Sequence, residues 1–119
     1  MTAQERLELI VRTLDMKRGE DISVLEITDL TILADYFVIA NGTSNTHVKT
    51  LADETEFKLS QAGVKPLRTE GYQTASWIIL DYGDIVVHVF MKDARNLYQL
   101  EQLWADGKQI DISGFLTKE

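Results

Sequence analysis

The sequence predicts an α/β fold in which helices flank a mixed sheet of about five strands. Two apolar runs, 76–81 and 85–90, are rich in Ile, Val and Trp and are separated by Tyr-Gly-Asp, which indicates an antiparallel hairpin. A strand at 36–41, a helical pattern ending at Gly63 and an extended stretch from Pro66 are typical of a crossover between parallel strands. A hairpin and a crossover together require strands of both directions.

The first part of the chain supplies a capped helix and a strand. Thr2 and Glu5 match the S/T-x-x-E capping box, and the apolar positions that follow keep helical spacing, so we expect a helix over residues 3–16. Residues 21–27 have the composition of a strand.

The crossover helix follows the strand that ends at Asn41 and Gly42. Thr43 or Ser44 can cap it, and its apolar positions keep helical spacing. Those positions are Val48, Leu51, Ala52, Thr55 and Leu59. We expect the piece at 65–69 to run parallel to 36–41 through a right-handed connection.

The turn of the hairpin decides which side chains share a face. A bulky Tyr82 resists positive φ, so we expect a type I turn followed by a G1 bulge with Gly83 in the left-handed region. This register places Ile78, Leu80, Val86, His88 and Phe90 on one face and Trp77, Ile79, Ile85, Val87 and Val89 on the other. A slip of one residue would regroup them, but both faces stay apolar, so we expect the hairpin to lie between layers.

A further helix follows the hairpin. Asp93 can cap it, and its apolar positions are Leu97, Leu100, Leu103 and Trp104, which predicts a face that packs back on the sheet. Tyr98 and Glu101 fall on an adjoining stripe nearer the solvent. We expect one domain over residues 1–106 and a tail at 107–119 that is loosely ordered or forms a late strand.

Composition restricts the classes of function. The 119 residues include 19 acidic and 12 basic side chains, a net charge of −7, and no Cys. The lack of Cys excludes disulfides and thiolate catalysis. Without an apolar run of about 18 residues or a signal-peptide pattern, we expect a cytoplasmic protein with no membrane partner. The acidic excess argues against tight binding to a nucleic-acid backbone and suits a basic partner, so we expect no direct sequence-specific nucleic-acid binding.

The strand-to-helix turn from Asn41 to Ser44 lies where phosphate-binding loops occur, but it lacks the Walker and Rossmann glycines. A Gly-Ser turn before a helix also occurs in nucleotidyltransferases, whose paired carboxylates hold Mg²⁺. Here Asp81 and Asp84 flank a hairpin turn instead, so the metal pair is missing.

The two histidines, His47 and His88, are the remaining candidates for metal binding or acid–base catalysis. Without Cys or a carboxylate cluster they do not predict a zinc site. We expect His47 to be solvated and His88 to be hydrogen-bonded within its strand. Acid–base catalysis by Asp81 and His88 stays open as an alternative. We nevertheless expect that the protein has no bound metal, no cofactor and no catalytic residue.

The last third of the chain is rich in the residue types found at interface hot spots. These residues are Trp77, Tyr82, His88, Phe90, Arg95 and Tyr98. The same set is also compatible with core packing and an ordinary surface.

Several short motifs occur in a defined order along residues 3–106. They are Ala34-Asp35-Tyr36-Phe37-Val38-Ile39 with Gly42 and Ser44, Glu70-Gly71 ahead of Trp77, Leu80-Asp81, the stretch from Asp84 to Phe90, then Arg95, Tyr98, Leu100-Glu101 and Leu103-Trp104. In this order and spacing the chain resembles the ribosomal silencing factors, also called the Iojap-related family.

The resemblance implies an α/β fold related to nucleotidyltransferases, without their catalytic carboxylates or transferase activity. It implies a translation repressor that binds the large ribosomal subunit through ribosomal protein L-fourteen and blocks joining with the small subunit. It also implies a homodimer when free. Two alternatives remain: a degenerate nucleotidyltransferase using Ser44 with Asp81 or Asp84, and a dimeric module with a non-ribosomal partner.

With this resemblance we expect the partner-binding surface in the last third of the chain. Its apolar centre would comprise Trp77, His88, Phe90, Tyr98 and Leu100, with Arg95 as a polar neighbour and Glu70, Asp81, Asp93 and Glu101 as acidic groups around it. Ribosomal proteins are generally basic, so an acidic rim would speed encounter and fix orientation.

Overall fold

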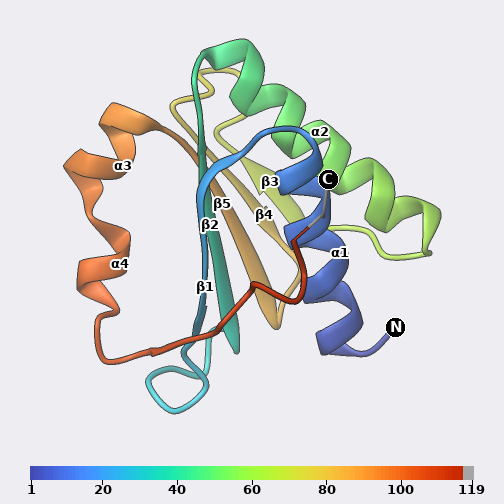
Figure 1. Cartoon of the computed structure of the whole chain (residues 1–119), viewed down its shortest axis with the longest axis vertical. Helices are drawn as coiled ribbons and strands as arrows, with labels where there is room; N and C mark the ends of the chain where they lie inside the picture. The colour runs from blue at the N-terminus through green and yellow to red at the C-terminus, as the bar shows by residue number, and fades with distance from the viewer. Residues whose placement is uncertain (117–119) are drawn as a thin grey trace.

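A computed structural model describes residues 1–116 and shows a six-stranded mixed sheet between two layers of helices (Figure 1). The elements are α1 (Ala3–Met16), β1 (Glu20–Glu26), β2 (Tyr36–Gly42), α2 (Asn45–Gln61), β3 (Arg68–Glu70), β4 (Trp77–Asp81), β5 (Ile85–Met91), α3 (Lys92–Tyr98), α4 (Leu100–Leu103) and β6 (Lys108–Gln109). The strand order is β3-β4-β5-β2-β1-β6. The predicted mixed α/β class is confirmed, and the short strand β6 raises the expected number of strands to six.

Both long helices begin at the caps that the sequence predicts. The Glu5 backbone N–H donates to Thr2 Oγ1 (3.1 Å), and Glu5 Oε1 accepts from the Thr2 backbone N–H (3.0 Å), which completes the capping box of α1. Ser44 caps α2 by accepting from the His47 backbone N–H at 3.0 Å. Both helices bury one apolar face against the same side of the sheet (Figure 1).

The parallel pair at the centre of the sheet is β2 and β5. The prediction that 36–41 and 65–69 run parallel is confirmed, because β2 and β3 have the same direction, but β4 and β5 lie between them in the sheet. All three residues of β3 are exposed, whereas five of the seven in β5 are buried. A strand that is buried on both faces belongs at the centre, and a short exposed strand belongs at the edge.

The turn between β4 and β5 also differs from the prediction. The Tyr82 backbone N–H donates to the Ile85 carbonyl at 2.9 Å, so Gly83 and Asp84 form a two-residue loop without the predicted bulge. Gly83 has φ +89° at the first loop position, where type II′ turns require glycine. Tyr82 stays within the ladder and avoids positive φ in this way.

This turn shifts the hairpin register by one residue. Trp77 pairs with Phe90, and Ile79 pairs with His88. These four side chains therefore share a face, and the predicted separation of Trp77 and Ile79 from His88 and Phe90 is wrong. The consequence is an aromatic cluster that the sequence-based register did not bring together.

The segment after β5 is two short helices, where the sequence predicts one. Gln99 adopts the left-handed conformation (φ 48°, ψ 49°) and separates α3 from α4. The break changes the phase of the apolar stripe, so Leu97 and Leu103 are exposed, while Leu100 is buried. Met91 occupies the N-cap position of α3 in place of the expected Asp93, which lies in the first turn.

The sheet separates two apolar cores. The larger one lies under α1 and α2, and the smaller one lies under α3 and α4. The segment after α4 pairs antiparallel with β1 through β6, and it then runs toward α1 (Figure 1). Its apolar side chains Ile110, Ile112, Phe115 and Leu116 pack against the larger core.

Candidate partner-binding site

The smaller core carries an aromatic cluster on the sheet face toward α3 and α4. The cluster comprises Phe37, Trp77, His88, Phe90, Tyr98 and Trp104. Trp77 stacks on Phe90 at 4.9 Å between ring centroids and contacts Tyr98 at 4.9 Å. Since Trp77 is half-buried and Tyr98 is 50% exposed, the cluster reaches the surface at these two side chains.

A hydrogen bond connects Trp77 to His88. The indole Nε1–H donates to His88 Nδ1 at 3.1 Å. His88 is 5% exposed, and burial lowers the pKa of its imidazole to about 4, with a smaller opposing effect from the charge of Asp81. The ring is therefore neutral near pH 7, and its proton lies on Nε2, because Nδ1 is the acceptor. The expected hydrogen-bonded histidine is thus found, although Nε2 has no partner among the described residues.

Three of the residues expected at the apolar centre lie below the surface. Phe90 is 0% exposed, and His88 and Leu100 are also buried. They support Trp77 and Tyr98 from beneath, so a partner that docks on this face meets Trp77 and Tyr98 first. Of the five residues expected at the apolar centre, the structure therefore places only Trp77 and Tyr98 at the surface.

Arg95 and Glu101 form an ion pair within a hydrogen-bond network, in which the Arg95 side chain is 10% exposed and that of Glu101 is 40% exposed. Arg95 Nε donates to Glu101 Oε1 (2.8 Å), and its Nη1 donates to Asn41 Oδ1 (2.9 Å). Glu101 Oε2 also accepts from Ser23 Oγ at 3.2 Å. The network connects α3 and α4 to β1 and β2 and helps to hold these helices on the sheet.

Two expected acidic groups, on β3 and β4, have a cationic neighbour. Arg68 lies between Asp81, at 3.1 Å, and Glu70, at 3.6 Å. Asp81 Oδ1 also accepts from the Gly83 backbone N–H at 2.8 Å. Asp93 is exposed at the start of α3. Arg68, which the sequence analysis missed, therefore pairs with two of the expected acidic groups.

The two carboxylates at the hairpin turn do not converge. Asp84 accepts two hydrogen bonds of 2.6 Å from the guanidinium of Arg6 in α1, whereas Asp81 binds Arg68 in β3. The bonds from Arg6 hold the pKa of Asp84 below its ordinary value, against the opposing effect of burial. Within residues 1–116 no group of three or more His, Asp or Glu side chains could hold a metal ion.

Backbone N–H groups at the turn from Asn41 to Ser44 and at the start of α2 donate hydrogen bonds to side chains of the same segment. The Thr43 backbone N–H donates to His47 Nδ1 at 2.9 Å, and the His47 backbone N–H donates to the Ser44 cap. His47 Nε2 lies 2.8 Å from the carbonyl oxygen of Lys17, so the expectation of a solvated His47 is wrong. These contacts explain the turn as a helix cap, and they leave fewer N–H groups for an anion.

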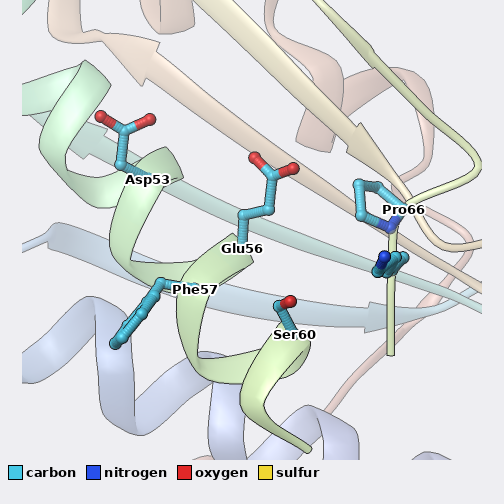
Figure 2. A pocket seen from close by; sticks show the side chains of 6 residues that line it. Asp53, Glu56, Phe57, Ser60 and Pro66 are labelled. Carbon is cyan, nitrogen blue, oxygen red and sulfur yellow. The ribbon is translucent and has the colours of Figure 1, made fainter. Parts of the chain in front are cut away.

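A second surface feature is a hollow of about 510 Å³ between α2 and the segment before β3 (Figure 2). Asp53, Glu56 and Ser60 extend from one side of α2, and Phe57 extends from another. None of the ten residues expected at the partner-binding surface lines this hollow.

The sequence-based expectation of the site left out several apolar residues that belong to the aromatic cluster or lie beside it. Phe37 and Val86 are paired neighbours on the same sheet face, and both are half-buried. Leu97 and Leu103 are 76% and 75% exposed and line a hollow beside Tyr98. Phe37 lies within the strand that the sequence predicts at 36–41, whereas the exposed leucines flank the helix break at Gln99.

Known proteins resemble the chain over its whole length. A family model described as ribosomal silencing factor during starvation matches residues 1–119. A ribosomal silencing factor from Halalkalibacterium halodurans is 38% identical over 117 residues, which are 98% of this chain and 100% of that protein. A mouse protein named for mitochondrial assembly of the ribosomal large subunit is 29% identical over 101 residues, which are 82% of this chain and 44% of that protein.

A solved structure agrees with the fold. A crystal structure of a protein from Chromobacterium violaceum has a TM-score of 0.86 and 36% identity, and the match covers 95% of this chain and 93% of that one. In the described part of the chain no helix is long and apolar enough to cross a membrane. The family match and the relatives lead to one conclusion: the chain belongs to the ribosomal silencing factor family.

Proposed function

We propose that this protein represses translation by binding the large ribosomal subunit through ribosomal protein L-fourteen and by sterically blocking the small subunit. The observation that carries the proposal is the contact between half-buried Trp77 and exposed Tyr98, supported by buried aromatic rings, in a chain of the silencing factor family. Aromatic anchors on a rigid base are typical of interface hot spots. A steric block needs no reaction, so the proposal includes no catalytic residue, metal or cofactor.

The charge of the molecule supports a basic partner. The chain has a net charge of −7. Glu70 and Asp81 lie on the sheet face that carries Trp77, and Asp93 is exposed at the start of α3. Opposite charge on a ribosomal protein would increase the association rate and orient the encounter. We place the protein in the cytoplasm, where its proposed target is found.

We further propose that the free protein forms a homodimer. Leu97 and Leu103 expose apolar side chains next to Tyr98. A second copy of the chain could cover them when no ribosome is present. In this arrangement the dimer and the ribosome would compete for neighbouring surface.

The test is binding of purified large subunits by Trp77→Ala and Tyr98→Ala variants. Removing a true anchor costs about 2 kcal/mol or more, which is roughly a thirtyfold loss of affinity. Phe57→Ala is the matched control, because Phe57 is 55% exposed on α2, on the other side of the sheet. We expect the control to sediment with large subunits like the parent.

If both folded variants bind large subunits as tightly as the parent, Trp77 and Tyr98 are not the contact surface. If the parent itself does not bind large subunits, the proposed function is wrong.

A further inference from the structure

His88 lies directly beneath the proposed contact surface, although it does not reach the solvent. Its Nδ1 accepts the Trp77 indole N–H at 3.1 Å, and its ring lies in the smaller core with Phe37 and Phe90. We propose that His88 is a positioning residue that fixes the Trp77 indole in the orientation that binds the partner. This inference rests on the proposed function and adds a residue that acts through another.

The ring contacts of Trp77 do not fix its orientation by themselves. The plane of the Trp77 indole makes an angle of 24° with the ring of Phe90 and of 42° with the ring of Tyr98, and Tyr98 is itself half exposed. Aromatic stacking permits offsets and tilts of this kind, whereas a hydrogen bond to a ring nitrogen defines both a distance and a direction. The bond to His88 therefore selects one rotation of the indole.

The acceptor is itself held rigidly. His88 pairs with Ile39 of β2 on one side and with Ile79 of β4 on the other, so its backbone is fixed at the centre of the sheet. The ring of Phe37 meets the imidazole edge to face at 4.7 Å and 72°. A rigid acceptor orients the indole before binding, which reduces the side-chain freedom lost on association.

The unpaired Nε2 supports a role other than stability. This buried N–H has no hydrogen-bond partner among the described residues, and an unpaired buried donor destabilises a fold. A leucine at this position would fill a similar volume without a polar atom. We therefore expect His88→Leu to be at least as stable as the parent, yet to bind the partner more weakly.

The experiment compares His88→Leu, His88→Asn and Trp77→Ala. Asn retains an acceptor oxygen close to the position of Nδ1, and Leu removes it. The chain has two tryptophans, so an indole NMR spectrum contains one signal for Trp77 and one for Trp104, which serves as the internal reference. Affinity for purified large subunits and the thermal midpoint are measured on the same samples.

We expect His88→Leu to shift the Trp77 indole signal, to leave the Trp104 signal in place, and to weaken binding roughly tenfold. His88→Asn should retain the hydrogen-bonded signal and most of the affinity. A His88→Leu variant that binds like the parent, while Trp77→Ala does not, overturns the positioning role alone. Equal losses of affinity in the Asn and Leu variants, with the indole bond intact in the Asn variant, also overturn it. Parent-like binding by Trp77→Ala instead contradicts the contact surface.

Discussion

At the residue scale, burial separates polar groups that act on the surface from groups that act within the fold. Arg95 and Glu101 have the chemistry of a binding rim, yet the structure uses them to hold α3 and α4 on the sheet. His88 combines full burial with a single hydrogen bond. A residue type alone therefore does not distinguish a contact residue from a supporting one.

The first prediction concerns the pH dependence of stability that His88 causes. Its pKa is about 4 in the folded chain and 6.5 ordinarily. Below pH 6.5 the unfolded chain binds a proton that the folded chain does not, so stability falls as the pH decreases from 6.5 to about 4. The full loss corresponds to about 3 kcal/mol.

Urea unfolding of the parent and of His88→Leu over this pH range measures the effect. The other titrating groups are common to both proteins, so the difference between their free energies of unfolding isolates His88. We expect the advantage of His88→Leu to grow toward acid. Parallel pH profiles would show that the imidazole titrates normally.

At the element scale, the connection from β3 to β4 sets the position of Trp77. Gly71 has φ +79°, and a Cβ there would lie 2.0 Å from the Trp77 carbonyl oxygen. Gly63 has a similar φ of +84°, but no atom lies within 4 Å of the place where its Cβ would be. An alanine at either position would therefore carry backbone strain, but only an alanine at Gly71 would also clash with the Trp77 carbonyl.

We predict that Gly71→Ala destabilises the fold by about 2 kcal/mol more than Gly63→Ala does. Both variants carry the strain of an alanine in the left-handed region, roughly 1 kcal/mol, but only Gly71→Ala pushes against β4. Gly71→Ala should also weaken binding to large subunits, because it displaces Trp77. Equal destabilisation by the two substitutions, measured by chemical unfolding, would argue against this close approach.

The elements differ in how far the sequence could predict them. The caps of α1 and α2 depend on residues three positions apart, and Thr2 and Ser44 were both identified as candidates. The hairpin register depends on a choice between two turns around Gly83, and the sequence favoured the wrong one. The break at Gln99 has no glycine or proline to indicate it.

The site could be predicted only in outline for the same reason. Trp77 and Tyr98 were identified from their residue types, but their contact with each other depends on the hairpin register and on the path of α3. The exposure of Leu97 depends on the break at Gln99. The strand pairing of the hairpin and the left-handed residue Gln99 therefore determine which side chains reach the surface, and local sequence patterns do not reveal either feature.

At the scale of the whole molecule, the two faces of the sheet differ in how they are covered. Two long helices, α1 and α2, close one face, while the short helices α3 and α4 cover the other (Figure 1). Trp77 and Tyr98 reach the surface on the second face, in a chain with a net charge of −7. Such a molecule suits the proposed task of occupying a basic surface on a ribosomal protein.

The most direct test of this account measures subunit joining. Purified large and small subunits are mixed with the parent protein or with Trp77→Ala, and joined ribosomes are separated by sucrose gradient. We predict that the parent lowers the joined fraction in proportion to its occupancy of large subunits, and that Trp77→Ala does so only at much higher concentration. If the parent occupies the large subunit while the small subunit still joins at the uninhibited level, the steric mechanism is contradicted.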